Sequence, residues 1–131
     1  MFLSYSMSEE IDVNMEIMVA VKDPNNSQGW DWVTVREGRV VKFFVRDIGR
    51  GNALLLSYIF EDGKGGLVVD LSKITSMIRH STGIYIEGPT PSLALKENNK
   101  IKRLNGLKYR IALYGDIADK IQEATGIKAT L

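Results

Sequence analysis

The chain has no cysteine, only one histidine and no long apolar run. The absence of cysteine excludes disulfides and thiolate metal sites, and a single histidine excludes a histidine-rich metal centre. A transmembrane helix needs about 20 consecutive apolar residues, and no segment approaches that length. The first residues, MFLSYSMSEE, also lack the basic start and long apolar stretch of a signal peptide. We therefore expect an intracellular protein of the cytoplasm or nucleoid, with no membrane association, metal or cofactor.

The chain also has little net charge, +1 in total, which argues against a strongly basic nucleic-acid-binding protein. The charge is unevenly distributed along the sequence. Residues 1–31 contain six acidic side chains and one lysine, so residues 32–131 carry a net charge of +6. An acidic N-terminal segment either keeps a protein soluble or competes with a polyanion for the basic remainder.

Length and composition indicate one globular domain. A chain of 131 residues, 44% hydrophobic and 25% charged, can bury a core without disulfides. Residues 1–11 are predicted to be a mobile leader, within which Met7 could serve as an alternative start. Residues 12–131 are predicted to form a single α+β domain.

The spacing of apolar residues predicts the elements of this domain. Alternation predicts a strand over residues 13–21, ended by turn residues at 23–27. Residues 32–36 and 39–46 are predicted to form a hairpin around Glu37-Gly38. Helical spacing occurs at residues 73–80 and 116–126. The remaining predicted strands are 53–60, 67–71, 84–87, 92–96, 101–104 and 107–114, with Asn98-Asn99 as a turn and Asn105-Gly106 as a hairpin turn.

This outline is a group of strands followed by a helix, twice, in units of about 12–82 and 83–131. Strands in consecutive meanders followed by helices favour an α+β fold with a largely antiparallel sheet. Because the two units share little residue identity, the repeat is one of architecture and not of sequence.

The first hairpin carries the strongest functional signal. Alternate residues of a strand point to opposite faces, so its valines and Phe43 can form one apolar face. The opposite face combines aromatic rings and cations, which single-stranded nucleic acids bind through base stacking and phosphate attraction. Burial under another element, or in a dimer interface, explains the same pattern equally well. The residues of this face are Trp30, Trp32, Thr34, Arg36, Lys42, Phe44 and Arg46.

The predicted strand 107–114 repeats this two-faced pattern, with Lys108, Arg110 and Tyr114 opposite Tyr109 and Ile111. Two such faces on one continuous sheet would form a binding surface, whereas on opposite sides of the molecule they would be unrelated. The sequence leaves this open.

Catalytic chemistry has little support. His80 is predicted at a helix C-terminus, where a favourable interaction with the helix dipole explains it. The carboxylates of Glu61, Asp62, Asp116 and Asp119 are explained by turn and cap roles. We therefore expect no catalytic residues and no enzyme activity.

Residues 40–72, VVKFFVRDIGRGNALLLSYIFEDGKGGLVVDLS, resemble the strand core of the positive-cofactor-four type of transcriptional coactivator, a group related in outline to Whirly and Pur proteins. The matching pieces are the strand ending in Val45-Arg46-Asp47, the apolar strand ending at Phe60, and the glycine-rich turn that follows. The resemblance implies single-stranded nucleic-acid binding across a curved sheet, formed by a homodimer. By this resemblance, Arg46, Tyr58 and Phe60 are expected to be binding residues. The sequence departs from the family at Ser57, where the coactivators have charged residues.

The sequence thus predicts a non-catalytic protein that binds single-stranded DNA or RNA, in transcription or replication. The alternatives are a structural or assembly protein with an aromatic protein interface and, third, a small enzyme or ligand-binding domain. The predicted binding residues are Trp30, Trp32, Arg36, Lys42, Phe44, Arg46, Tyr58, Phe60, Lys108 and Arg110.

Overall fold

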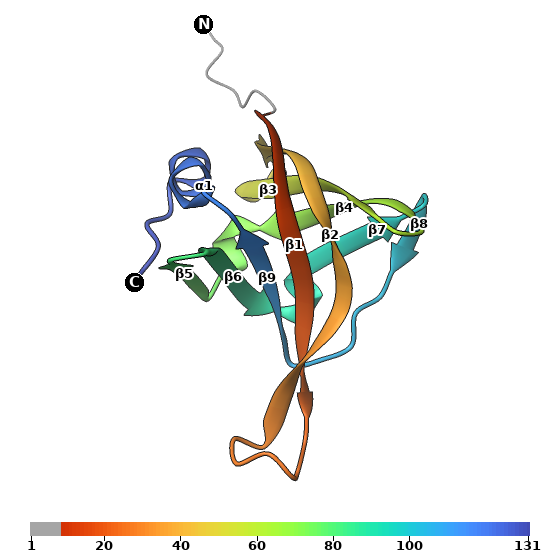
Figure 1. The fold of residues 1–131 in the computed structure, drawn as a ribbon. Helices are drawn as coiled ribbons and strands as arrows, with labels where there is room; N and C mark the ends of the chain where they lie inside the picture. Colours follow the sequence, from red (N-terminus) through yellow and green to blue (C-terminus); the bar gives the residue numbers. More distant parts are fainter. Residues whose placement is uncertain (1–8) are drawn as a thin grey trace, which may run out of the picture.

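The computed structural model describes residues 9–131, which form a curled sheet with a short helix near the C-terminus (Figure 1). Two 3₁₀ turns, η1 (Leu71–Lys73) and η2 (Thr90–Ser92), and one α-helix, α1 (Ala118–Thr125), accompany the strands in this part of the chain. None of the described helices is long and apolar enough to cross a membrane. The strands are β1 (Glu9–Lys22), β2 (Trp30–Asp47), β3 (Asn52–Phe60), β4 (Gly63–Asp70), β5 (Ser76–His80), β6 (Gly83–Pro89), β7 (Leu93–Glu97), β8 (Lys100–Lys102) and β9 (Lys108–Tyr114).

The described strands belong to one sheet in the order β5-β6-β9-β1-β2-β3-β4-β7-β8, and every neighbouring pair is antiparallel. The sheet curls around a single core, because buried side chains from both of its halves belong to one apolar cluster. Ile86 and Ile111 come from one half, and Leu56 and Leu95 from the other. Helix α1 contributes Ile121 and so covers one end of this core (Figure 1).

The prediction of an α+β fold with two strands-then-helix units is wrong, because the described chain is mostly strand with one short α-helix. Residues 73–80 contain the end of η1 and then β5 instead of a helix. The spacing of Ile74, Met77 and Ile78 suits a helix, but eight residues are too few to fix the period. Pairing with β6 buries Met77 in the core, and β-branched isoleucines favour a strand.

The predicted helix at residues 116–126 is confirmed as α1. Gly126 ends it in the left-handed conformation, with φ of 73°, as a C-terminal glycine often does. Asp116 does not cap the helix, since Ile117 occupies the N-cap position and no side chain caps it there.

The predicted hairpin around Glu37-Gly38 is wrong, because residues 30–47 form one long strand. A Cβ at position 38 would lie 2.5 Å from the carbonyl oxygen of Ile59. The glycine therefore allows the end of β3 to approach β2 next to the pair Arg39–Ile59. The true hairpin joins β1 and β2 through the predicted turn at 23–27, which is confirmed. Because β1 begins at Glu9, residues 9–11 of the predicted leader belong to a strand, and the rest of the leader lies outside the described residues.

The predicted hairpin around Asn105-Gly106 is also wrong. β8 pairs with β7 at one edge of the sheet, whereas β9 lies between β6 and β1. The segment between them crosses to the other half of the sheet, and Gly106 packs against β1, where a Cβ would lie 2.9 Å from the carbonyl oxygen of Ala20. The predicted turn at Asn98-Asn99, between β7 and β8, is confirmed, with positive φ at both residues.

Candidate functional site

Four aromatic side chains and two cations gather on the outer face of the sheet, over β6, β9, β1 and the first half of β2. Residues paired across antiparallel strands point to the same face. Arg110 pairs with Met18 on β1 and with Glu87 on β6, while Trp32 pairs with Ala20, two residues beyond Met18. We call this group the aromatic face: Trp30, Trp32, Tyr85, Tyr114, Lys108 and Arg110.

The guanidinium of Arg110 lies between two rings of the aromatic face. Its central carbon is 4.3 Å from the centre of the Trp32 ring and 4.5 Å from that of Tyr85. Its Nε donates a hydrogen bond of 2.6 Å to Oε2 of Glu87, whose side chain is buried. Stacking on the two rings and the carboxylate together fix the orientation of the arginine.

Lys108 lies beside both tryptophans of the aromatic face. Its Nζ is 4.8 Å from the Trp30 ring centre and 5.4 Å from that of Trp32, and 3.9 Å from Oε1 of Glu87. The two indole rings meet edge to face, with their centres 5.3 Å apart. Glu87 therefore partly neutralises both cations of this face.

At the far end of the aromatic face, Tyr114 donates a hydrogen bond of 2.9 Å to Glu16, which also accepts a hydrogen bond from Thr34. Burial, together with the carboxylate of Glu16, raises the pKa of Tyr114 to about 12. The tyrosine is therefore a neutral hydrogen-bonding group at physiological pH.

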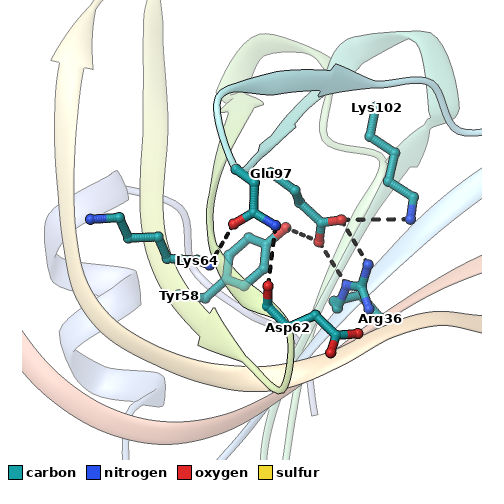
Figure 2. Close-up of polar contacts among 7 residues, drawn as sticks. Arg36, Tyr58, Asp62, Lys64, Glu97 and Lys102 are labelled. Atoms are coloured by element: carbon teal, nitrogen blue, oxygen red, sulfur yellow. Dashed lines mark hydrogen bonds and ion pairs between the residues drawn. The ribbon is translucent and has the colours of Figure 1, made fainter.

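A second arginine–glutamate cluster lies on the inner side of the sheet (Figure 2). Arg36 of β2 makes two hydrogen bonds of 2.7 Å to the carboxylate of Glu97 at the end of β7. The hydroxyl of Tyr58 donates a third, also of 2.7 Å, and Lys102 lies 3.5 Å away. The guanidinium of Arg36 covers the ring of Phe60 at 4.1 Å. We call these residues the Glu97 cluster.

The electrostatics of the Glu97 cluster favour the charged carboxylate. The hydrogen bond from Arg36 is the main cause that lowers the pKa of Glu97 to about 2, against the opposing effect of burial. Burial and the same carboxylate raise the pKa of Tyr58 well above its usual value. Glu97 therefore stays ionised and Tyr58 stays neutral throughout the physiological range.

An irregularity in β2 places Arg36 on the inner side. Arg36 pairs with Ile17, and Thr34 pairs with the next residue, Met18, so Val35 is an extra residue in the ladder. Such a bulge breaks the alternation of faces. The prediction that Arg36 shares a face with Trp32 assumed a regular strand, and the structure separates them.

The structure also separates Lys42, Phe44 and Arg46 from the tryptophans. β1 pairs with Trp30 at one end and with Phe43 at the other. Their nearest members, Trp32 and Lys42, pair with Ala20 and Glu10, so at about 3.3 Å per residue roughly 33 Å of β1 lies between the two groups. Glu16 and Glu37, which are cross-strand neighbours, and the ion pair of Asp12 with Arg39 lie between them along β1 and β2.

Tyr58 is not available for stacking on a base. It is only 1% exposed, its ring packs over Gly65, and its hydroxyl is bonded to Glu97. Phe60 is partly buried beneath Arg36. The family resemblance predicted both Tyr58 and Phe60, at the end of β3, as binding residues. Tyr58 instead belongs to the core and Phe60 to its rim.

Sequence reasoning missed Tyr85, Glu87 and Glu97. A signal existed for Glu97, because it follows Leu93 and Leu95 in the period of the buried face, where a carboxylate needs a partner. Tyr85 and Glu87 alternate with Ile84 and Ile86, which places them on one face of β6. Nothing in the sequence places β6 next to β9.

The fold and the site define a curled antiparallel β-sheet protein with an aromatic and cationic outer face. No protein-family model, curated protein or solved structure matches the chain. The resemblance of residues 40–72 to positive-cofactor-four proteins therefore stays a prediction.

Proposed function

We propose that the aromatic face binds single-stranded DNA or RNA and catalyses no reaction. The observation that carries this proposal is that Trp30 and Trp32 of β2 lie beside Lys108 and Arg110 of β9, although the two pairs are far apart in the sequence. Flat rings accept any base by stacking, and cations attract the phosphates between the bases.

This geometry supports binding with weak sequence preference. Trp30, Trp32, Tyr85 and Tyr114 are all partly exposed, so their rings can contact bases. Stacking contributes about 1–3 kcal/mol per base and discriminates poorly between bases. Lys108 and Arg110 can neutralise at most two phosphates, so log K should fall with log salt at a slope no steeper than about −1.4.

A second candidate function, a protein interface on the same face, is favoured by one observation. Glu87 neutralises part of the charge of both Lys108 and Arg110, which suits a partner of low charge better than a polyanion. Tryptophan, tyrosine and arginine are also the residues that contribute most to protein interfaces. The partner in this case would be a second copy of the chain or another subunit of an assembly.

Intrinsic fluorescence can test the proposal, because both tryptophans of the chain belong to the aromatic face. We expect an oligothymidine to quench this fluorescence, with an affinity that falls as salt rises. Trp32→Ala should weaken binding about tenfold by removing one stacking platform. Phe60→Leu is a matched control, because Phe60 lies beneath Arg36 in the Glu97 cluster and should leave affinity unchanged.

Two outcomes would count against nucleic-acid binding. One is unchanged fluorescence at micromolar oligonucleotide in low salt. The other is a concentration-dependent change of molecular mass that Trp32→Ala abolishes, which would assign the face to self-association.

A further inference from the structure

A groove crosses the outer face of the other half of the sheet, over β3, β4 and β7. Its volume is about 310 Å³, and its lining contains two lysines and no carboxylate. Its lining includes Val41, Ser57, Ile59, Lys64, Gly66 and Lys96.

The floor of the groove is backbone, because Gly66 has no side chain to fill it. Gly66 pairs with Ser57 on one side and Lys96 on the other, so the three positions form a row across the sheet. Lys42 continues the row, as the partner of Ser57 on β2. A Cβ at position 66 would meet only the carbonyl oxygen of Leu56, at 3.8 Å, so the space above it is open.

The two lysines of the lining, Lys64 and Lys96, form no ion pair among residues 9–131, whereas Lys102, on the inner side, contacts Glu97. Lys42 forms no ion pair there either, although Glu10 is its cross-strand neighbour on β1. Figure 2 shows the ammonium of Lys64 pointing away from the Glu97 cluster. The groove therefore combines an open backbone floor with unpaired positive charge.

We propose that this groove binds the phosphate of a nucleotide. Lysine ammonium groups are compact charges that suit phosphate oxygens, and the Ser57 hydroxyl and Asn99 amide can add hydrogen bonds. The apolar part of the lining, Val41 and Ile59, suits the sugar and base. The proposal does not depend on nucleic-acid binding at the aromatic face, with which the groove shares no residue.

A free nucleotide and a nucleotide within a strand offer the same phosphate, and titration with different ligands distinguishes these two sources. The amide NMR spectrum of the protein would be followed with thymidine monophosphate, with thymidine and with oligothymidine. We expect the monophosphate to shift the amides of Ser57, Gly65, Gly66 and Asn98, and thymidine to bind at least about tenfold more weakly because it lacks the phosphate. Binding of the oligonucleotide in the groove at least tenfold tighter than the monophosphate would identify a strand as the source.

Two variants test the assignment. Gly66→Val should fill the open space and abolish these shifts, and valine suits a strand, so the thermal transition should be unchanged or raised. Lys96→Glu should weaken monophosphate binding at least about tenfold through charge reversal. Lys128→Glu, at an exposed position outside the lining, should bind as the wild type does.

No shift of the groove amides at millimolar thymidine monophosphate would overturn the proposal. Equal binding by Lys96→Glu and Lys128→Glu would overturn it too, even if Gly66→Val failed to fold. Loss of oligothymidine quenching of the tryptophans bears only on the aromatic face.

Discussion

The aromatic face and the Glu97 cluster each contain an arginine–glutamate pair, and the two pairs are equally buried. The side chains of Arg36 and Glu97 are 23% and 9% exposed, and those of Arg110 and Glu87 are 22% and 8% exposed. Each glutamate also has a lysine nearby and each arginine covers an aromatic ring. Composition and burial therefore do not distinguish them.

What distinguishes the pairs is the set of strands that they connect. Arg36 on β2 and Glu97 on β7 are separated by β3 and β4 in the sheet, so their ion pair spans the inside of the curled sheet. Arg110 and Glu87 are direct neighbours on adjacent strands of the outer face. The first pair joins strands that are not paired in the sheet, whereas the second holds a cation among the partly exposed rings of the aromatic face.

The largest expected effect is on stability, from Arg36→Met. Removal of the arginine leaves Glu97 with its charge buried and only Lys102 to compensate it. Breaking such a pair costs about 3 kcal/mol of unfolding free energy, which urea denaturation would measure. A loss below about 1 kcal/mol would show that the pair does not hold the two halves together.

Acid should weaken the protein through the same carboxylate. The pKa of Glu97 is about 2 in the folded protein and about 4.5 without its partners. Because the folded value is the lower one, this stabilisation is complete above pH 4.5 and is lost as the pH falls through about 2. Glu97→Gln should therefore lose stability at neutral pH and show a shallower dependence between pH 4.5 and 2, measured by urea denaturation at each pH. If the free energy of unfolding fell equally with pH in the wild type and in Glu97→Gln, the lowered pKa of Glu97 would be contradicted.

A smaller effect is expected from Tyr58→Phe, which removes one hydrogen bond to the Glu97 carboxylate and keeps the buried ring. A hydrogen bond to a charged group contributes about 1.5 kcal/mol or somewhat more. Tyr114→Phe, which removes the bond to Glu16 at a more exposed position, is the matched comparison and should cost less in the same denaturation experiment. Equal losses of unfolding free energy in the two variants would mean that burial does not strengthen the hydrogen bond of the Tyr58 hydroxyl.

The smallest expected effect on stability is that of Arg110→Met. The methionine keeps an apolar stem between Trp32 and Tyr85, and Lys108 remains near Glu87. We expect a loss of about 1 kcal/mol, below that of Arg36→Met, because Arg110 and Glu87 lie on strands that already pair with each other, whereas Arg36 and Glu97 lie on strands that do not. A loss as large as that of Arg36→Met would mean that both pairs are structural.

The sequence predicted the strands better than it predicted their partners. Alternation identified β1 and β9, an apolar run identified β3, and Gly126 identified the end of α1. Residues 73–80 were wrongly predicted as a helix because a short apolar segment fits the periods of a helix and of a strand. Asn105-Gly106 was wrongly predicted as a hairpin turn because its turn chemistry says nothing about which strands pair. The crossing from β8 to β9 is set by long-range packing, which local patterns do not contain.

For the candidate site, the residue types were predictable and their grouping was only partly so. Strand alternation correctly placed Trp30 with Trp32, and Lys108 with Arg110. The bulge at Val35, which turns Arg36 inward, has no local sequence signal. Phe44 lies far from the tryptophans because β2 continues through Glu37-Gly38, a pair whose local chemistry suggests a hairpin turn.

The most direct test of this account measures stability and oligothymidine affinity together for Arg36→Met and Arg110→Met. We predict opposite outcomes: Arg36→Met loses stability and, under conditions where it remains folded, keeps wild-type affinity, while Arg110→Met stays folded and binds at least about tenfold more weakly. Wild-type affinity in Arg110→Met would contradict the account, because the arginine between Trp32 and Tyr85 would then contribute nothing to binding.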